Sequence, residues 1–505
     1  MSTKARNLLL ITVDEMRGDC AGFTGNAEVS TPRLDELAAR GTVLAKHFAP
    51  FPKCVPSRCA MQTGRYPHTD GLRTVMEDNH LPTGRPSLAP FLRKQGYETA
   101  VLGLNHVWER ADFYGEGTRQ NKKGAGVVDY TSFTEGPLAE VLEKPWTDPP
   151  SSPRAGARDE CLLANGYAGP MQRKEATGFS DEARAEQACL YLREVRDPQK
   201  PFYLQVNFGK PHPPYTVKEP YYSQYDPARL TPFPHQLPAQ APLPLRAQRE
   251  WRFGENVTEE GLRELQAIYY GMISYVDALV GEVLDALAEC GLQEETVVLF
   301  CSDHGDYAGQ YGLPEKWDTS LQDCLLHVPG ILAGPGIPSG ARVEELTEIV
   351  DTAPTLLDCL GFVPPPEWIR HGESLLPLLS GKAPGKEAVF AAGGHEAPMR
   401  ARFNTPVWQE REGHRCKATM GKQLTYQQCP EAMAPARMIR TSDWKLILRE
   451  TGGHELYHLF EDPHEMNNLY GREGMEAVTL DLMERLCEWT LRTQPDRPIV
   501  ATVGA

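Results

Sequence analysis

The first two-thirds of the chain alternate short apolar runs with longer stretches of helical periodicity. The apolar runs are residues 7–13, 99–104, 201–208, 296–302 and 330–333. Helical patterns cover residues 181–196 and 259–290, and Thr31 followed by Pro32 predicts the start of another helix. Buried strands that alternate with helices predict an α/β fold. We expect a large mixed, mostly parallel sheet sandwiched by helices.

Polar residues with chemical potential follow several of these runs. Asp14 ends the first, His106 follows the second and Asp303 follows the run at 296–302. Ligands of open α/β sheets bind beyond the carboxyl ends of the strands, so we expect these three side chains to converge.

The pattern changes near residue 438. Short strand candidates at 438–439, 444–448 and 455–459 precede an amphipathic helical stretch at 479–492. This predicts a small antiparallel sheet packed against a helix. We therefore divide the chain into a larger domain, residues 1–435, and a C-terminal subdomain, residues 436–505.

Charge and cysteine content narrow the class of function. The 505 residues carry a net charge of −16, which argues against a nucleic-acid binder and against docking on an anionic membrane. No apolar run approaches the roughly 20 residues of a membrane span. The run at 8–13 is too short for a signal peptide. Twelve scattered cysteines favour a reducing compartment, and we expect the cytoplasm. Residues 115–178 and 215–249 are rich in loop formers, where specificity usually lies.

A twelve-residue segment, CVPSRCAMQTGR from Cys54 to Arg65, carries the strongest chemical signal. It resembles the signature of type I sulfatases, within the alkaline-phosphatase-like superfamily. In that family the cysteine is oxidised to formylglycine, so the resemblance implies that Cys54 is the nucleophile precursor. One hydroxyl of the hydrated aldehyde attacks the sulfate ester, and the other later expels sulfate. The resemblance also implies that Arg58 holds the hydrate and offsets developing charge.

Four more segments resemble the family in the same order along the chain. Asp14-Glu15 and Asp303-His304 match its two metal-binding pairs, with the converted Cys54 beside them. Glu15 departs from the usual Asp-Asp or Asp-Gln, which leaves its ligation open. Carboxylates suit Ca²⁺, whereas a histidine ligand keeps Mn²⁺ and Zn²⁺ as alternatives.

The other two segments and one lysine supply the expected catalytic cations and acids. The resemblance implies that His106, in GLNH, lies near the formylglycine, and that His212, in PHPP, protonates the leaving group. Lys316 matches a lysine that contacts the sulfate. Leu104 stands where the family usually has lysine, so the expected anion clamp lacks one cation. His395 and Glu396 are candidates for the leaving-group pocket.

The chain is thus predicted to be a sulfuric-ester hydrolase acting on a small anionic ester, with a formylglycine-generating or maturase enzyme as a partner. Two alternatives stay open. One is a phosphonate monoester or phosphate diester hydrolase, which Leu104 and the Asp-His pair also fit. The other is a non-catalytic binder of sulfated ligands with an unconverted Cys54. The leaving group and the oligomeric state, a homo-oligomer included, stay open too.

Overall fold

A mixed sheet forms the centre of the larger part of the molecule. The computed structural model describes residues 6–73, 80–108, 168–170, 181–253, 258–397, 400 and 425–494. The strand order of the main sheet is β10-β2-β9-β7-β1-β5-β3, and β8 pairs with β2. The strands are β1 (Asn7–Asp14), β2 (Gly41–Phe48), β3 (Glu98–Gly103), β5 (Phe202–Pro211), β7 (Thr296–Ser302), β8 (His327–Val328), β9 (Gly330–Ala333) and β10 (Ala341–Glu348).

Strand β1 occupies the middle of this sheet because every residue of its sequence, NLLLITVD, is buried. It runs parallel to β5 on one side and to β7 on the other. Strand β3 extends the parallel group beyond β5, whereas β9 runs antiparallel to both β7 and β2. The register pairs Val13 with Ser302, so β1 and β7 end side by side.

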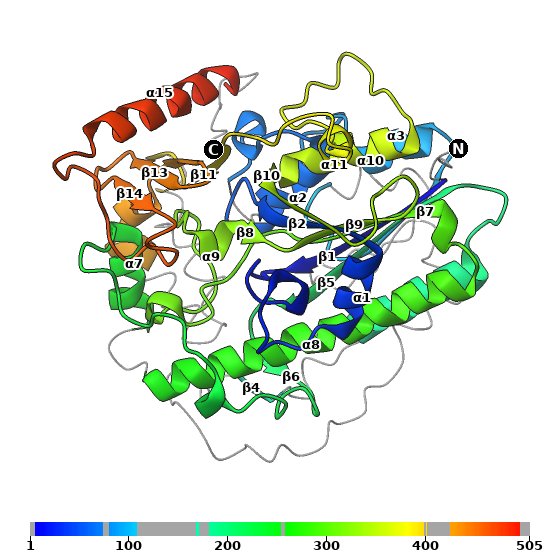
Figure 1. Ribbon diagram of the computed structural model, residues 1–505, viewed down its shortest axis with the longest axis horizontal. Coiled ribbons are helices and arrows are strands. Elements are labelled where there is room, and N and C mark those ends of the chain that lie inside the picture. The colour runs from blue at the N-terminus through cyan, green and yellow to red at the C-terminus, as the bar shows by residue number, and fades with distance from the viewer. Residues whose placement is uncertain are drawn as a thin grey trace, which may run out of the picture.

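Helices cover both faces of the main sheet (Figure 1). One face carries α1 (Pro32–Arg40), α6 (Asp181–Leu190) and the long α8 (Glu259–Glu289). The other carries α2 (Cys54–Thr63), α3 (Leu88–Lys94) and α10 (Thr352–Leu360). Helix α8 has 23 buried residues. A helix that is apolar around most of its circumference is buried on several sides, so α8 packs against more than one neighbour. The predicted sandwich of helices around a mostly parallel sheet is confirmed.

A second, smaller sheet is antiparallel, with the order β11-β12-β13-β14. Its strands are β11 (Val389–Gly393), β12 (Ala436–Arg440), β13 (Trp444–Arg449) and β14 (Glu455–His458). Helix α15 (Glu476–Arg492) packs on it through Leu482, Leu486 and Trp489. This confirms the predicted antiparallel sheet with its helix. Strand β11 precedes residue 436, so the smaller sheet draws one strand from the other side of the proposed domain boundary.

Short elements complete the description: β4 (Ala168–Pro170), β6 (Tyr215–Val217), α7 (Leu243–Gln248), α9 (Asp323–Leu326) and α11 (Leu376–Leu379). Two of them, β6 and α7, fall in the stretch 215–249 that was expected to be loop. Apart from β4, the predicted loop 115–178 lies outside the described residues.

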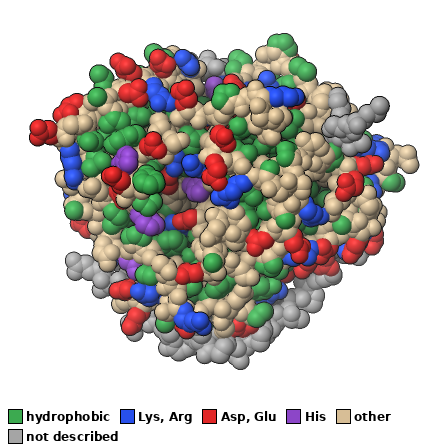
Figure 2. All heavy atoms as spheres, viewed as in Figure 1, with side chains coloured by type: hydrophobic (Ala, Val, Ile, Leu, Met, Phe, Trp, Pro, Cys, Tyr) green, Lys and Arg blue, Asp and Glu red, His purple; other side chains and the backbone are tan. Residues whose placement is uncertain are grey.

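Three properties of the described residues relate to the sequence-based expectations: the state of the cysteines, the character of the helices and the distribution of surface charge. Ten cysteines lie in the described residues, and all of them are free thiols. Within the same residues, no helix combines the length and apolar character needed to cross a membrane. On the face shown in Figure 2, basic side chains are interspersed with acidic ones instead of forming a stripe.

A buried ion-pair cluster joins the two sheets. Lys445 of β13 is fully buried, and its Nζ lies 2.5 Å from Asp323 Oδ1 and 2.7 Å from Glu465 Oε1. Asp323 begins α9, next to the main sheet, and Arg440 of β12 adds a second cation at 3.1 Å. The cluster therefore ties α9 to the smaller sheet.

We predict that Lys445→Met lowers the free energy of unfolding by about 3–5 kcal/mol, because it leaves Glu465 buried without its cation and removes one of the two cations that pair with Asp323. Denaturant unfolding followed by circular dichroism measures this change. The exposed Lys382 supplies a control, and Lys382→Met should leave the unfolding midpoint unchanged. Equal stability of the two variants would contradict the proposed importance of the cluster.

Candidate active site

Cys54 is the first residue of α2, and its side chain is almost fully buried. Lys53, at the N-cap, has an extended backbone, so α2 begins abruptly with its amino-terminal end at Cys54. Burial raises the pKa of the Cys54 thiol well above its usual value. The nearby carboxylates of Asp14 and Asp303 raise it further, and Lys53 and Arg58 oppose them. An unmodified thiol here stays protonated near neutral pH and is a poor nucleophile.

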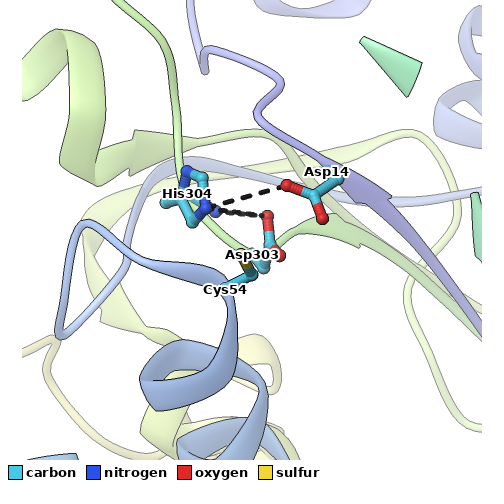
Figure 3. A group of neighbouring side chains, drawn as sticks. All are labelled: Asp14, Cys54, Asp303 and His304. Carbon is cyan, nitrogen blue, oxygen red and sulfur yellow. Dashed lines mark hydrogen bonds and ion pairs between the residues drawn. The ribbon is translucent and has the colours of Figure 1, made fainter. Parts of the chain in front are cut away.

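Asp14 and Asp303 meet at one edge of the main sheet because the parallel strands β1 and β7 end together. His304 follows Asp303, and its Nε2 lies 3.8 Å from Asp14 Oδ1 and 3.7 Å from Asp303 Oδ1. Figure 3 shows these three side chains and Cys54 around one point. The ligand atoms of the four residues lie within 4.8 Å of one another. The structure therefore brings together residues from three distant segments, as the strand ends predicted.

Arg58 bridges the two carboxylates from one turn further along α2. Its Nε donates to Asp303 Oδ2 at 2.7 Å, and its second terminal nitrogen donates to Asp14 Oδ2 at 3.2 Å. The remaining nitrogen donates to Thr12 Oγ1 at 3.0 Å. The guanidinium is thus committed to the carboxylates and to β1. Each carboxylate keeps its other oxygen, Oδ1, on the side of His304.

The tautomer of His304 determines which of its ring nitrogens can act as a metal ligand. Its Nδ1 lies 2.9 Å from the carbonyl oxygen of Gly305, which can only accept, so Nδ1 carries the proton. Nε2 then presents a lone pair toward Asp14 and Asp303. Asp14 Oδ1 and His304 Nε2 are buried and lack a hydrogen-bond partner among the described residues. Burial, reinforced by the charge of Asp14, raises the pKa of Asp303, although Arg58 opposes the rise. A divalent cation between these atoms would satisfy all of them, so the residues fit a metal site.

Glu15 adds a further carboxylate to the same edge. It is fully buried, it has a left-handed backbone with φ of 71°, and it forms an ion pair with Lys316. His212 Nε2 lies 3.3 Å from Glu15 Oε1, and the His212 side chain is 36% exposed. Ligand atoms of Asp14, Glu15 and His212 also lie within 4.8 Å of one another. Glu15 is therefore placed among the metal candidates, and His212 stands at the solvent side of the site.

His106 lies near this group, just after β3. Burial, followed by the positive charge of Arg58, lowers the pKa of its imidazole to about 3. Its Nδ1 is buried, and no described part of the chain supplies it with a hydrogen-bond partner. Leu104 is half-buried, and only its main-chain oxygen makes a polar contact, with Asn207 Nδ2 at 2.9 Å. Lys210 does not point into the cluster, since its Nζ donates to the Pro214 carbonyl oxygen at 2.9 Å.

Two charged residues beside Cys54 were not singled out from the sequence. Lys53 Nζ lies 2.7 Å from Asp318 Oδ1, and the other carboxylate oxygen of Asp318 lies 2.9 Å from His395 Nε2. All three side chains are buried. A lysine directly before the signature cysteine was the one available signal. His395 was expected to be a candidate for the leaving-group pocket. In the structure it contacts Asp318, and Asp318 contacts Lys53, the residue before Cys54.

Comparison with known proteins agrees with this geometry. The family model "Sulfatase" matches residues 6–362, and the model "N-sulphoglucosamine sulphohydrolase, C-terminal" matches residues 395–492. The chain is 27% identical over 486 residues to a choline-sulfatase of Rhizobium meliloti, covering 93% of this chain and 83% of that protein. It is 27% identical over 376 residues to an arylsulfatase of Clostridium perfringens, covering 70% and 74%.

A solved structure, that of the phosphonate monoester hydrolase of Agrobacterium radiobacter, has a TM-score of 0.70 and 25% identity, and covers 97% of this chain and 96% of that one. The family model spans most of the main-sheet unit and includes every residue of the cluster around Cys54. The chain belongs to the sulfatase family, a family of sulfuric-ester hydrolases.

Proposed function

We propose that this protein hydrolyses a sulfate monoester by means of a formylglycine hydrate at Cys54 and one divalent metal ion. The observation that supports this best is the position of Cys54, at the start of α2, where its sulfur lies within 4.8 Å of ligand atoms of Asp14, Asp303 and His304. A helix N-terminus favours an anionic group, and the buried thiol itself is a poor nucleophile. Conversion of Cys54 requires a formylglycine-generating or maturase enzyme, and free cysteines throughout the described residues support a reducing compartment, the cytoplasm.

Asp14, Asp303 and His304 would hold the metal, with Glu15 as a further ligand and the converted Cys54 beside it. Ca²⁺ suits the carboxylates, and the histidine keeps Mn²⁺ and Zn²⁺ open. When bound, the ion would hold sulfate oxygens and lower the charge on the attacking hydroxyl. Arg58 orients Asp14 and Asp303 toward it.

The remaining residues divide the proton transfers and the binding of sulfate. His212, at the exposed side of the cluster, is placed to protonate the departing ester oxygen. Lys316 is buried against Glu15 and contributes positive charge to the sulfate. His106 is neutral because burial lowers its pKa, and we assign it to the collapse of the sulfated hydrate as a neutral hydrogen-bond partner of the remaining hydroxyl.

Phosphonate monoester hydrolysis is the second candidate. Leu104 removes one cation from the expected sulfate clamp, and the similar structure of a phosphonate monoester hydrolase covers nearly the whole chain. Turnover of an aryl sulfate and of the matching aryl phosphonate monoester by the same converted enzyme separates the two. A higher kcat/KM for the phosphonate would overturn our assignment of sulfate esters.

We predict that Cys54→Ala abolishes turnover, because alanine cannot be converted to the aldehyde. Cys59→Ala should stay active. Cys59 lies on the core side of α2, and its thiol makes weak contacts with the backbone oxygens of His106 and Val107 and with no catalytic side chain of the described residues. Peptide mass spectrometry measures conversion of Cys54 as a loss of about 18 Da, a chemical mass difference, and aryl sulfate assays measure activity. Near-normal turnover by Cys54→Ala would refute the mechanism.

We predict that elemental analysis finds about one divalent ion per chain. Its removal by a chelator should lower the melting temperature, since four buried side chains lose their shared cation. His304→Ala and Asp303→Asn should not retain the ion. Asp481→Asn, on the exposed face of α15, is the matched control and should bind it normally. Full metal content in the His304→Ala and Asp303→Asn variants would place the ion elsewhere.

We predict that His212→Ala slows hydrolysis of alkyl sulfates by about 10²–10⁴-fold, and that of a nitrophenyl sulfate far less. An alkoxide needs a proton as the ester bond breaks, whereas a nitrophenolate hardly does. The measurement is the dependence of kcat/KM on leaving-group pKa, with Lys316→Ala compared directly. Lys210→Ala, two residues before His212 near the end of β5 but with its side chain turned away, should show the wild-type dependence. An unchanged dependence in His212→Ala with a steeper one in Lys316→Ala would move the acid role to Lys316.

A further inference from the structure

Lys53 is a buried ammonium directly before the nucleophile position. Its side chain is 6% exposed, and its Nζ lies 2.7 Å from Asp318 Oδ1. A buried ammonium this close to a carboxylate forms an ion pair, so Lys53 presents a positive charge next to Cys54.

The position of this ammonium is fixed from the smaller sheet. Asp318 Oδ2 lies 2.9 Å from His395 Nε2, and His395 follows β11. The backbone of His395 donates to the Met433 carbonyl oxygen at 2.8 Å, and Gly394 donates to the Asp318 carbonyl oxygen at 2.8 Å. His395 thus holds Oδ2 of Asp318, and Oδ1 of the same carboxylate faces the Lys53 ammonium. Lys53 has three N–H groups, and among the described residues only Asp318 lies within hydrogen-bond distance of them.

The geometry places Lys53 next to the proposed site. It is the N-cap residue of α2, directly before Cys54, and its partner Asp318 comes two residues after Lys316, whose ammonium forms an ion pair with Glu15. Arg58 is committed to Asp303, Asp14 and Thr12, so it has little capacity left for an incoming anion. Leu104 supplies no charge at all.

We propose that Lys53 is a specificity-determining residue that donates a hydrogen bond to a non-bridging sulfate oxygen, and that it supplies the cation which Leu104 does not. Asp318 and His395 are positioning residues for its ammonium. In an in-line displacement the leaving group departs on the side opposite the nucleophile. Lys53 adjoins the nucleophile, so it acts on the non-bridging oxygens and not on the ester oxygen. This inference rests on the proposed sulfate chemistry at Cys54.

The test compares Lys53→Met, Lys53→Arg and the control Lys200→Met, whose lysine is on the surface. Because Lys53 adjoins Cys54, rates are divided by the formylglycine content from peptide mass spectrometry. We expect Lys53→Met to raise KM and the inhibition constant of inorganic sulfate by about 10–100-fold, the value of a charged hydrogen bond. The factor should be the same for good and poor leaving groups, unlike the effect of His212→Ala. Lys53→Arg should recover most of the affinity.

An unchanged inhibition constant in Lys53→Met, or a wild-type enzyme that inorganic sulfate does not inhibit, would overturn the proposal. A loss that grows with leaving-group pKa would also overturn it, by assigning Lys53 to the ester oxygen.

Lys53→Met leaves the buried carboxylate of Asp318 without its cation, which destabilises the fold. A second variant, Lys53→Met with Asp318→Asn, therefore removes both charges. It should stay weak in sulfate binding, and recovery of wild-type affinity would trace the loss to Asp318 instead. A converted wild-type enzyme that binds inorganic sulfate, measured by calorimetry, but cleaves no sulfate ester would refute the proposed function alone, since Lys53 is still judged by that affinity.

Discussion

The bridge from Arg58 to Asp14 and Asp303 is the contact on which the rest of the site depends. Two carboxylates at the ends of neighbouring strands repel each other, and burial makes ionisation of both costly. Arg58 takes one oxygen of each, which fixes both side chains and leaves the opposite oxygens directed toward His304. Because Arg58 and Cys54 lie one turn apart on α2, the same contact also sets the nucleophile position against the cation site.

Much of this arrangement follows from local sequence patterns. Asp14 and Asp303 each end an apolar run, and parallel neighbouring strands necessarily bring such ends together. Strands β2 and β10 were not predicted, for different physical reasons. β2 is buried yet carries Lys46 and His47, which interrupt its apolar character, whereas β10 is an edge strand with several exposed charges. A search for apolar runs does not detect a strand that contains several polar residues.

The group formed by Lys53, Asp318 and His395 could not be predicted from such sequence patterns. Its members come from the N-cap of α2, a loop after β7 and the end of β11, and the contact between Asp318 and His395 alone spans 77 residues. No periodicity joins positions so far apart. Each residue also has an ordinary alternative role, because most buried ions in proteins simply pair with one another. Only the coordinates show that Asp318 and His395 pair with the residue that precedes Cys54.

The location of this group assigns different tasks to the two sheets. The main sheet supplies the proposed metal ligands Asp14 and Asp303 at the ends of β1 and β7, and α2 supplies Cys54, the proposed nucleophile precursor. The smaller sheet reaches the same point from the other side, since Ala392 of β11 donates to the Pro50 carbonyl oxygen and His395 holds Asp318. The loop between Pro50 and Lys53 is thus clamped between both units. Lys53 is therefore held from the smaller sheet, through Asp318 and His395, whereas Asp14 and Asp303 are held by the ends of β1 and β7. If Lys53 binds sulfate as proposed, the smaller sheet positions one cation next to Cys54 and the main sheet positions the carboxylates of the proposed metal site.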